Sequence, residues 1–422
     1  MDSGEVAVTQ DSAGEGQGQR LRIAYLLQQF PVPTETFVVS DIAALVAQGH
    51  DVSVYTVKWP PKAEQELLKR SAVPESVPIH RPSWAGLGAW PKLTWQWRRS
   101  LPVVLGAIAK GAVKSPLTAV QALLCIPRVL EIADQVVRSD FDVVHSFWSR
   151  HSGLVLPALK ARHSRPLRTA WAGAYDIVAD DFLVDATLGA AEIAFSHAEV
   201  NRAYLERKAD PSRVAIIWQG IPLVELGPEN QRKPFEWITT SSLDLSKNVE
   251  GVIRAFALAR ERQPKLRLRI LGDGPDRPRL ENIVRELGCS EAVAFAGHVP
   301  RDEVFAQMQR ASAFLIFSKK KSERLPNVVK EALWAGCTVV SSNTPGIEEL
   351  IPDDSIGYVV DPDDPEAVGG VVNAVLGSSE TEAAERRARA RAYIAEHFSS
   401  DKGMRRYADA WRQKLKGSAQ RR

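Results

Sequence analysis

The sequence has few cysteines, and they are poorly placed for joint chemistry. Cys125, Cys289 and Cys337 are the three in 422 residues, and no two of them form a C-x-x-C pair. An odd, widely spaced set gives neither a disulfide framework nor a zinc site. No Asp-x-Asp metal signature occurs in a suitable loop, so no metal ion is expected. A reducing compartment fits these residues, and we expect a cytoplasmic protein.

Long apolar runs are also missing. The longest candidate, residues 101–109, is half of the about 18 residues that a membrane-spanning helix needs. The first twenty residues are polar and acidic, without the apolar core of a signal peptide, and are expected to form a disordered tail. We therefore expect a chain that does not cross a membrane.

Acidic residues are absent from one long segment. Between Ser76 and Leu130 there is no Asp or Glu. The segment contains seven cations and four interleaved tryptophans, namely Arg81, Lys92, Arg98, Arg99, Lys110, Lys114, Arg128, Trp84, Trp90, Trp95 and Trp97. Indoles and cations together favour peripheral contact with an anionic membrane through residues 81–114, which would place the protein at the inner face. Core tryptophans with ordinary surface cations are an equal alternative. The net charge of +3 is too small to indicate nucleic acid.

The composition and length predict two globular domains. Apolar residues make up 45% and charged residues 25%, and 422 residues exceed one ordinary core. The polar run GPENQRKP at 227–234 is typical of a linker. We expect a disordered tail at 1–20, a first domain at 21–225, a second at 226–398, and a last helix and tail at 399–422.

Both domains alternate short apolar strands with helical patterns. In the first, LRIAYLL is followed by a helical pattern, Gly49 and DVSVYTV, which is a βαβ unit. In the second, the strand-like runs are FEWITTSS, LRLRILG, AVAFAG, SAFLIFS, CTVVSS and YVV, with helices starting near Asn248, Pro278, Arg301, Leu325 and Gly346. Two doubly wound α/β domains predict a ligand site at the carboxyl ends of the strands, in a cleft between the domains.

The segment from Ser322 to Ile351 is the most informative. Pro326 fits the first position of a helix, where its missing N–H costs nothing, and Gly336 fits the end of that helix. The free N–H groups near Leu325 to Asn327 then form an anion site at the positive end of the helix dipole. A diphosphate is the expected ligand.

Glu323 and Glu331 flank this helix start. Their carboxylates can accept hydrogen bonds from vicinal hydroxyls, which sugars and ribose both supply. An isolated E-x7-E pair is more often two surface glutamates of a solvated helix, but the surrounding sequence favours a site.

That surrounding sequence, SERLPNVVKEALWAGCTVVSS with PGIEEL, resembles the signature of glycosyltransferase family 4 (group 1). The resemblance extends over 271–288 and 295–318 and, more weakly, over most of the chain from Leu21 to Leu415. It implies the GT-B fold: two facing Rossmann-like domains, an interdomain cleft and a C-terminal crossover helix. It also implies a retaining glycosyltransferase that moves a sugar from a nucleotide diphosphate donor, most simply a UDP- or GDP-sugar, to a hydroxyl of a glycan, a lipid-linked or a small-molecule acceptor. No further cofactor is needed.

The resemblance assigns roles by position. Glu323 would contact the transferred sugar, and Lys247 would pair with the diphosphate as the leaving group departs. Glu331 would bind the ribose hydroxyls. The remaining donor-binding positions are Leu325 and Asn327 through backbone N–H groups, Gly272, Gly346 and Glu349.

Two departures from the family pattern concern charge and the first domain. Ser242 stands where the family has an arginine, and the basic run 319–321 with Arg324 is either its replacement or a solvated charge run. In the first domain, WAGAYDIV resembles the H-G-x-D segment, with Asp176 matched as a catalytic candidate but Gly173 at the histidine position.

Two further features of the first domain are a histidine at the end of a strand and the loop before the first helix. His145, at the end of FDVVHSF, either faces the cleft or, more favourably, packs as a structural histidine. The loop FPVPTETFV resembles the P-x-x-S/T-E-T-F element of transferases that build exopolysaccharides and related glycans. That resemblance implies that Thr34, Glu35 and Thr36 cap the first helix and border the acceptor side.

Other functions on the same architecture stay open at this point. A nucleotide-sugar epimerase or a phosphorylase is one, although neither is expected to have this E-x7-E context. A non-catalytic nucleotide-sugar binding protein is another, because Ser242 and Gly173 depart from the pattern.

Overall fold

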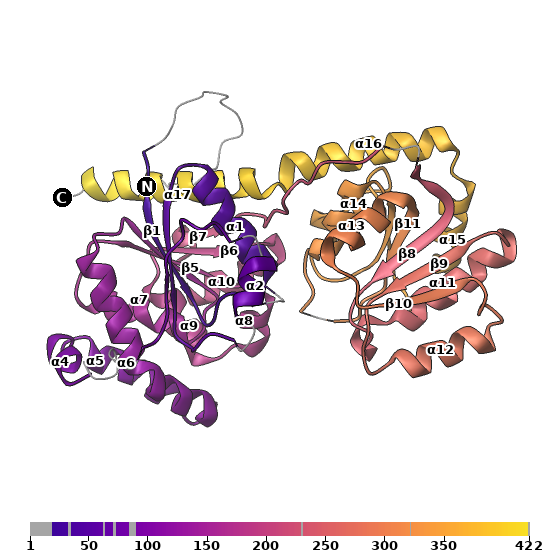
Figure 1. The fold of residues 1–422 in the computed structure, drawn as a ribbon. Helices are drawn as coiled ribbons and strands as arrows, with labels where there is room; N and C mark the ends of the chain where they lie inside the picture. The colour runs from indigo at the N-terminus through magenta and orange to yellow at the C-terminus, as the bar shows by residue number, and fades with distance from the viewer. Residues whose placement is uncertain are drawn as a thin grey trace. The chain divides into compact units, whose positions relative to one another are not determined.

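A computed structural model describes residues 19–32, 35–61, 64–70, 73–83, 90–228, 231–320 and 322–420. The chain forms two compact units, one ending at Trp218 and taking in the residues from Ser400 on, the other spanning Gln219–Ser399 (Figure 1). Most of the expected tail, residues 1–18, lies outside the described residues, as do Thr34, Trp84 and Lys321.

Unit 1 contains a seven-stranded parallel sheet of order β3-β2-β1-β4-β5-β6-β7. Its strands are β1 Arg22–Leu27, β2 Asp51–Thr56, β3 Ile79–His80, β4 Val143–Phe147, β5 Leu167–Trp171, β6 Ile193–Ser196 and β7 Val214–Ile216. The chain runs from β1 outward to β3 and then returns to place β4 on the other side of β1. The strand order therefore reverses between β1 and β4.

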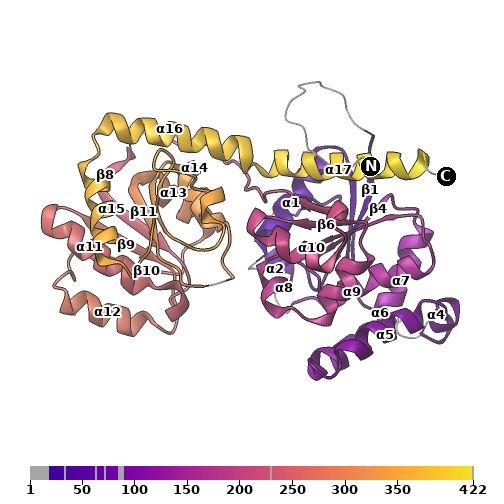
Figure 2. The same ribbon diagram turned by 180° about the vertical axis from the view of Figure 1, so that it is seen from behind.

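Helices cover both faces of this sheet. They are α1 Thr36–Ala47, α2 Glu64–Arg70, α4 Trp90–Gln96, α5 Leu101–Gly111, α6 Pro116–Arg138, α7 Val155–Ala161, α8 Ala174–Ala179, α9 Phe182–Ala190, α10 Arg202–Lys208 and α17 Ser400–Gln420. Because strand side chains alternate, Ile23 and Tyr25 of β1 belong to the core shared with α1 and α17, whereas Ala24 and Leu26 belong to the core shared with α6, α7 and α9. Figure 2 shows α7, α9 and α10 on the face away from α1.

The last helix packs on unit 1. Met404, Tyr407 and Trp411 of α17 are buried in the same core as β1 and α1. The amphipathic pattern of this segment, which required a surface to pack on, is explained by this contact.

The described residues of the segment rich in cations include helices α4 to α6, which the sequence did not predict. Trp97 follows α4, is fully buried, and donates from Nε1 to Asp134 Oδ1 at 3.3 Å, so this tryptophan is a core residue. Trp90 and Trp95 are exposed, at 37% and 70% of their surface. The alternative of core packing is thus right for Trp97 and wrong for Trp90 and Trp95.

Helix α6 is long and apolar enough to cross a membrane. The uninterrupted apolar runs in the sequence did not indicate this helix. It is the one such helix among the described residues. Its inward face is buried through residues such as Ile126, Val129 and Ile132, and Arg128 and Glu131 form an ion pair within it. The core helix of a globular unit meets the same length criterion, so this helix is weak evidence for a membrane span.

Unit 2 contains a six-stranded parallel sheet of order β10-β9-β8-β11-β12-β13. Its strands are β8 Lys233–Thr240, β9 Arg267–Leu271, β10 Val293–Gly297, β11 Ala311–Ile316, β12 Thr338–Ser342 and β13 Tyr358–Val360. Strands β9 and β10 extend the sheet on one side of β8, and β11 to β13 extend it on the other. The strand order reverses between β8 and β11, where open α/β sheets bind ligands beyond the carboxyl ends.

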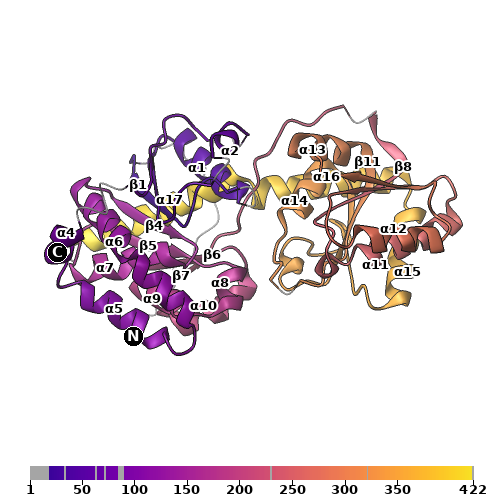
Figure 3. The same cartoon turned by 60° about the horizontal axis from the view of Figure 1, so that its bottom comes forward.

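The helices of unit 2 are α11 Val249–Arg262, α12 Arg277–Glu286, α13 Arg301–Arg310, α14 Asn327–Ala335, α15 Pro365–Gly377 and α16 Glu380–His397. Helices α11, α12 and α15 share one apolar core with the sheet (Figure 3). The helix expected at Gly346 is only a three-residue 3-10 turn, Ile347–Glu349. That prediction was wrong because Leu350 and Ile351 are buried and Pro352 follows, so no helix continues.

Candidate functional site

Lys247 and Glu323 meet at the point of unit 2 where the strand order reverses. Lys247 lies in the loop after β8, Glu323 in the loop after β11, and their Nζ and Oε1 atoms are 2.6 Å apart. Both side chains are largely buried, at 16% and 14% exposure. The other oxygen of Glu323, Oε2, is buried and accepts no hydrogen bond from the described residues. A carboxylate oxygen therefore stays available to a hydroxyl donor beside a fixed ammonium.

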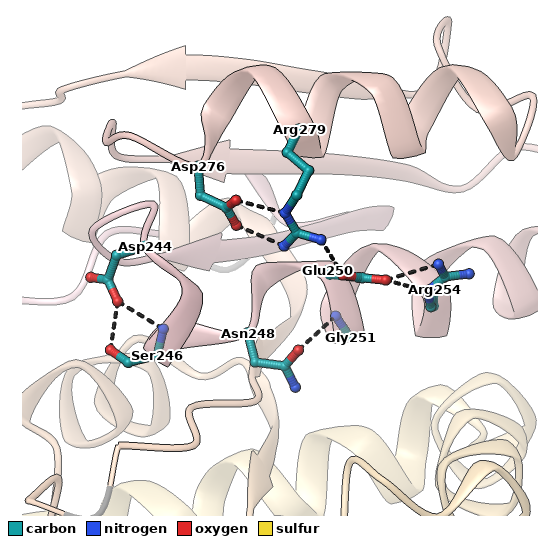
Figure 4. Close-up of polar contacts among 8 residues, drawn as sticks. All are labelled: Asp244, Ser246, Asn248, Glu250, Gly251, Arg254, Asp276 and Arg279. Atoms are coloured by element: carbon teal, nitrogen blue, oxygen red, sulfur yellow. Dashed lines mark hydrogen bonds and ion pairs between the residues drawn. The ribbon is translucent and has the colours of Figure 1, made fainter.

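The loop that holds Lys247 is organised by short side chains (Figure 4). Asp244 caps the 3-10 turn Leu245–Lys247 by accepting from Ser246 N at 2.9 Å, and Ser242 donates to its other oxygen at 2.6 Å. These hydrogen bonds, from Ser242 first, lower the pKa of Asp244. Asn248 adopts a left-handed conformation and caps α11 by accepting from Gly251 N at 3.3 Å. Lys247 thus projects from a rigid turn.

A chain of ion pairs ties this turn to the next loop. Arg279 of α12 binds Asp276 through two nitrogens, at 2.7 and 2.8 Å, and also contacts Glu250 of α11, which in turn pairs with Arg254 (Figure 4). Asp276 lies in the loop after β9. The first turns of α11 and α12, which follow the loops after β8 and β9, are therefore held together by an ion pair.

Gly272 allows the same two loops to approach closely. Its φ is +123°, and a Cβ at this position would lie 1.9 Å from the carbonyl oxygen of Ser241. Only glycine satisfies both conditions without moving the loop after β8. The site position assigned to Gly272 is therefore a backbone packing position next to Ser242.

The loop before α14 is strained. Leu325 is buried and has a φ of +47°, a conformation that leucine rarely adopts. Arg324 beside it is half-buried, and burial lowers the pKa of its guanidinium. Lys319, in contrast, is exposed and pairs with Asp363. Strain of this kind persists where the surrounding structure fixes it, and it is concentrated at functional sites.

Helix α14 begins one residue later than expected. Pro326 takes the N-cap position, Asn327 is the first helical residue, and Gly336 ends the helix with a φ of +89°. The N–H groups of the first turn have no partner within the helix. They follow Leu325 closely in the chain, at the end of the helix that Glu323 precedes. Asn327 and Leu325 are thus placed together with Glu323 along one short segment.

Glu331 forms an ion pair with a different cation from the one that pairs with Glu323. Glu331 accepts from Arg301 of α13 at 2.6 Å, and its side chain is 17% exposed. The two glutamates therefore have different cationic partners. Arg301 was missed at the sequence level, because its proximity depends on the packing of α13 against α14.

Gly346 and Glu349 lie after β12 at the same edge of the sheet. Gly346 begins the 3-10 turn with a φ of +87°, and the carbonyl of Glu349 accepts from the hydroxyl of Tyr393 at 2.8 Å. The loops after β8, β9, β11 and β12 thus contain Ser242, Gly272, Glu323 and Gly346 in turn. Among the described residues of the chain, no group of three His, Cys, Asp or Glu side chains is arranged to hold a metal ion.

In unit 1, Asp176 is fully buried and holds two loops together. Its oxygens accept from Ser149 N at 3.2 Å and Gly173 N at 3.0 Å, and Arg150 Nε is 3.6 Å from Oδ1. Burial raises the pKa of Asp176 to about 7. Both carboxylate oxygens are used to fix the ends of β4 and β5.

Packing explains why glycine occupies position 173. A Cβ there would lie 2.3 Å from the indole of Trp171 and 2.9 Å from that of Trp148. These two indoles meet edge to face with centroids 4.8 Å apart. Trp148 follows β4 with a φ of +66°, so it too is held in a left-handed conformation at the point where the sheet order reverses. Two tryptophans fill the space that a side chain at 173 would need.

The remaining candidates of unit 1 are His145 and Glu35. His145 is fully buried, its Nδ1 lies 2.9 Å from Thr169 Oγ1, and its ring is 4.9 Å from Tyr25, so the structural interpretation is confirmed. Burial lowers its pKa to about 3. Glu35 takes the N-cap position of α1 but makes no side-chain cap, so the predicted capping was wrong there. Burial instead raises the pKa of Glu35, which lies against Trp148.

Comparison with known proteins shows what kind of enzyme the chain resembles. Residues 228–396 match the model of the family described as glycosyl transferases group 1, and this range contains the whole arrangement around Lys247 and Glu323. The chain is a glycosyltransferase, and its residues 228–396 match group 1.

The relatives of this glycosyltransferase match it over different lengths of its sequence. It is 23% identical to the putative colanic acid biosynthesis glycosyltransferase WcaL of Escherichia coli over 389 residues, which covers 82% of this chain and 89% of that protein. It is 31% identical to glycogen synthase of Mycobacterium tuberculosis over 157 residues, or 37% of each chain. These relatives are glycosyltransferases, so they give the epimerase alternative no support.

Solved structures confirm the fold. A structure of Anabaena HepE in complex with UDP superposes with a TM-score of 0.69 at 15% identity, covering 93% of this chain and all of that one. Sucrose-phosphate synthase of Thermosynechococcus elongatus gives 0.65 at 16% identity, covering 94% and 100%. The two parallel sheets of this glycosyltransferase therefore form the GT-B fold.

Proposed function

We propose that this glycosyltransferase transfers a sugar from a UDP- or GDP-sugar to a hydroxyl of a glycan acceptor with retention of configuration. The observation that supports it is the Lys247–Glu323 pair beside the amino end of α14. In this proposal residues 226–398 bind the donor and residues 21–225 bind the acceptor.

Each residue then has a physical role. Lys247 pairs with the diphosphate and stabilises the charge that develops as the leaving group departs. Glu323 accepts hydrogen bonds from the transferred sugar through Oε2, the oxygen to which no described residue donates. The N–H groups at Leu325 and Asn327 bind phosphate oxygens, aided by the helix dipole. Glu331 accepts from the ribose hydroxyls, with Arg301 fixing its orientation.

The supporting positions surround this centre. Gly346 and Glu349 bind the sugar and phosphate from the loop after β12, and Gly272 lets the loop after β8 approach the donor. Ser242 offers no charge, so Arg324 supplies the second cation for the diphosphate. Asp176 acts in the acceptor domain, either at the reacting hydroxyl or by holding the loops at Ser149 and Gly173. No metal ion or further cofactor is required.

The experiment is a donor screen with stereochemistry. Purified chain is incubated with UDP- and GDP-sugars without acceptor, and slow release of nucleoside diphosphate is measured. Proton NMR of the first sugar released gives its anomeric configuration, which retention predicts to match the donor. The inverted anomer would exclude the retaining mechanism, and binding without any turnover of donor, alone or with acceptor glycans, would favour the non-catalytic alternative.

We also propose that α4, α5 and α6 contact the inner face of an anionic membrane from the cytoplasm. Residues 81–114 contain six of the seven cations. Exposed apolar side chains lie at the end of this range and beyond it: Val113 is 92% exposed, and Leu117, Val120 and Leu124 are 71%, 53% and 76% exposed. The last three lie three and four positions apart, on one stripe of α6. With no acidic residue from 76 to 130, a negative surface suits this face better than a second copy of the chain.

Vesicle flotation tests the membrane proposal. At low salt the protein is expected to float with vesicles containing phosphatidylglycerol and not with pure phosphatidylcholine, because each cation near an anionic surface contributes about 1 kcal/mol. Replacing Leu117 and Leu124 by Glu should abolish flotation, whereas Val178→Glu, at a position 62% exposed on α8, should not. Absence of wild-type flotation, or a dimer that the double variant dissociates, would overturn it.

A further inference from the structure

Lys330 of α14 is a lysine with no exposed surface. Its Nζ donates to the backbone carbonyl of Gln219 at 2.8 Å and to Asn327 Oδ1 at 3.0 Å, and it lies 5.4 Å from the centroid of the Phe398 ring. These two oxygens are neutral. Burying an ammonium is costly unless it is well hydrogen-bonded, so a lysine here needs a reason that an apolar side chain would not supply.

The contacts of Lys330 lie where the chain passes between its two units. Gln219 is the first residue of unit 2 after the first passage, and Ser399 is the last before the second. The two passages are paired: Ile221 N donates to Phe398 O at 2.8 Å, and Ile221 forms a parallel bridge with Ser399. Lys330 therefore contacts both passages from one helix.

Trp334, one turn later on α14, repeats the contact. Its Nε1 donates to the backbone carbonyl of Val224 at 2.8 Å. Positions four apart lie on the same side of a helix, so Lys330 and Trp334 bind the segment 219–224 along the side of α14. The same helix begins at Asn327, to which Lys330 also donates.

We propose that Lys330 is a positioning residue, which fixes segment 219–224 to the helix whose amino end binds the donor diphosphate. This inference rests on the proposed function of α14. Lys330 does not contact the substrate. It makes the joining segment part of the donor-binding unit, so that the chain between the units flexes only beyond Gln219. Trp334 acts in the same way at the other end of the segment.

We expect the loss of the Lys330 charge to lower turnover more than it weakens donor binding. In Lys330→Met the stem remains but the charge and its donors are lost, so segment 219–224 detaches while the N–H groups at the start of α14 remain. We expect kcat for transfer to fall about tenfold, which corresponds to about 1.4 kcal/mol. The dissociation constant of the free nucleoside diphosphate should change less than about threefold, which is a smaller free-energy change than the one expected for kcat. Lys330→Arg, which retains the charge, should recover part of kcat.

Hydrogen exchange gives a readout that is independent of activity. The Ile221 amide, protected by Phe398 O, should exchange faster in Lys330→Met, and Trp334→Phe should show a smaller change at Val224 and its neighbours. Lys265→Met is the matched control, because Lys265 is exposed before β9, and it should change neither quantity.

The outcomes are distinguishable. Unchanged Ile221 exchange and unchanged kcat in folded Lys330→Met would overturn the proposal. A lower melting temperature with normal kcat in the folded fraction would also overturn it, since that describes a purely structural lysine. Faster Ile221 exchange in a protein that turns over no donor would support the attachment and contradict the proposed function instead.

Discussion

Lys247 and Glu323 are 76 positions apart in the sequence and 2.6 Å apart at the reversal point of the second sheet. Neither residue is in an α-helix or strand: a 3-10 turn capped by Asp244 holds the first, and the strained loop at Leu325 holds the second. The pair places a positive and a negative side chain next to a helix amino terminus. A nucleotide diphosphate sugar presents the complementary groups, namely phosphate oxygens and sugar hydroxyls.

Removing either member of the pair should reduce transfer. We expect Lys247→Met and Glu323→Gln each to lower kcat by about 100-fold, the usual cost of one group that stabilises transition-state charge. The double variant should lose less than the product of the two, because the residues are in contact. Nucleoside diphosphate release by folded variants measures this. Full additivity would show that the two side chains act separately.

Asp176 should affect stability more than its exposed neighbours do. In Asp176→Asn one backbone N–H of Ser149 or Gly173 faces an amide N–H₂ and loses its acceptor, so the free energy of unfolding should fall by about 1–3 kcal/mol. Urea unfolding measures it, with Asp185→Asn, a largely exposed carboxylate on α9, as the control. If folded Asp176→Asn transfers sugar normally, Asp176 has no role at the reacting hydroxyl.

His145 should make unit 1 sensitive to acid. Its pKa is about 3 in the folded protein and 6.5 when unperturbed, because burial opposes the charged form. Between these values the unfolded chain binds a proton that the folded chain does not, so stability is complete above pH 6.5 and falls as the pH drops toward 3. The slope from this one group is at most about 1.4 kcal/mol per pH unit.

Exchange of the β4 amides across this pH range measures the effect. His145→Gln, which does not titrate, should flatten the profile, whereas His298→Gln, at an exposed position, should leave it unchanged. An identical pH slope in wild type and His145→Gln would mean that His145 is charged within the core.

Arg324 should contribute to donor affinity. If it replaces the cation missing at Ser242, Arg324→Ala should weaken nucleoside diphosphate binding about tenfold, as expected for loss of a charge-assisted hydrogen bond. Isothermal titration measures it, and Arg285→Ala, an exposed arginine on α12, is the control. Unchanged affinity would remove Arg324 from the donor site and leave the basic run as a solvated surface.

The sequence was most informative where local rules decide the structure. Alternating apolar runs predicted the strands, and Gly336 marked the end of α14, because both depend on neighbouring residues. The Arg301–Glu331 pair, the Lys330 contacts and the burial of Trp97 depend on packing between distant segments, which one sequence does not encode locally. Helices α4 to α6 were missed because their exposed apolar faces blur the helical period.

The position of Gly173 illustrates the same limit. In the sequence, Gly173 stands where the family has a histidine. In the structure, the indoles of Trp148 and Trp171 occupy the space that a side chain at this position would need. A residue type explains a position only when its neighbours in space are known.

The most direct test of the account is a thermal-shift titration of the wild type and of Lys247→Met with UDP and GDP. The account predicts that at least one nucleotide raises the melting temperature of the wild type, since a ligand at 100 times its dissociation constant stabilises by about 2.7 kcal/mol, and that the shift largely disappears in the variant. Equal shifts in both proteins, or none in the wild type with either nucleotide, would contradict donor binding at Lys247 and Glu323.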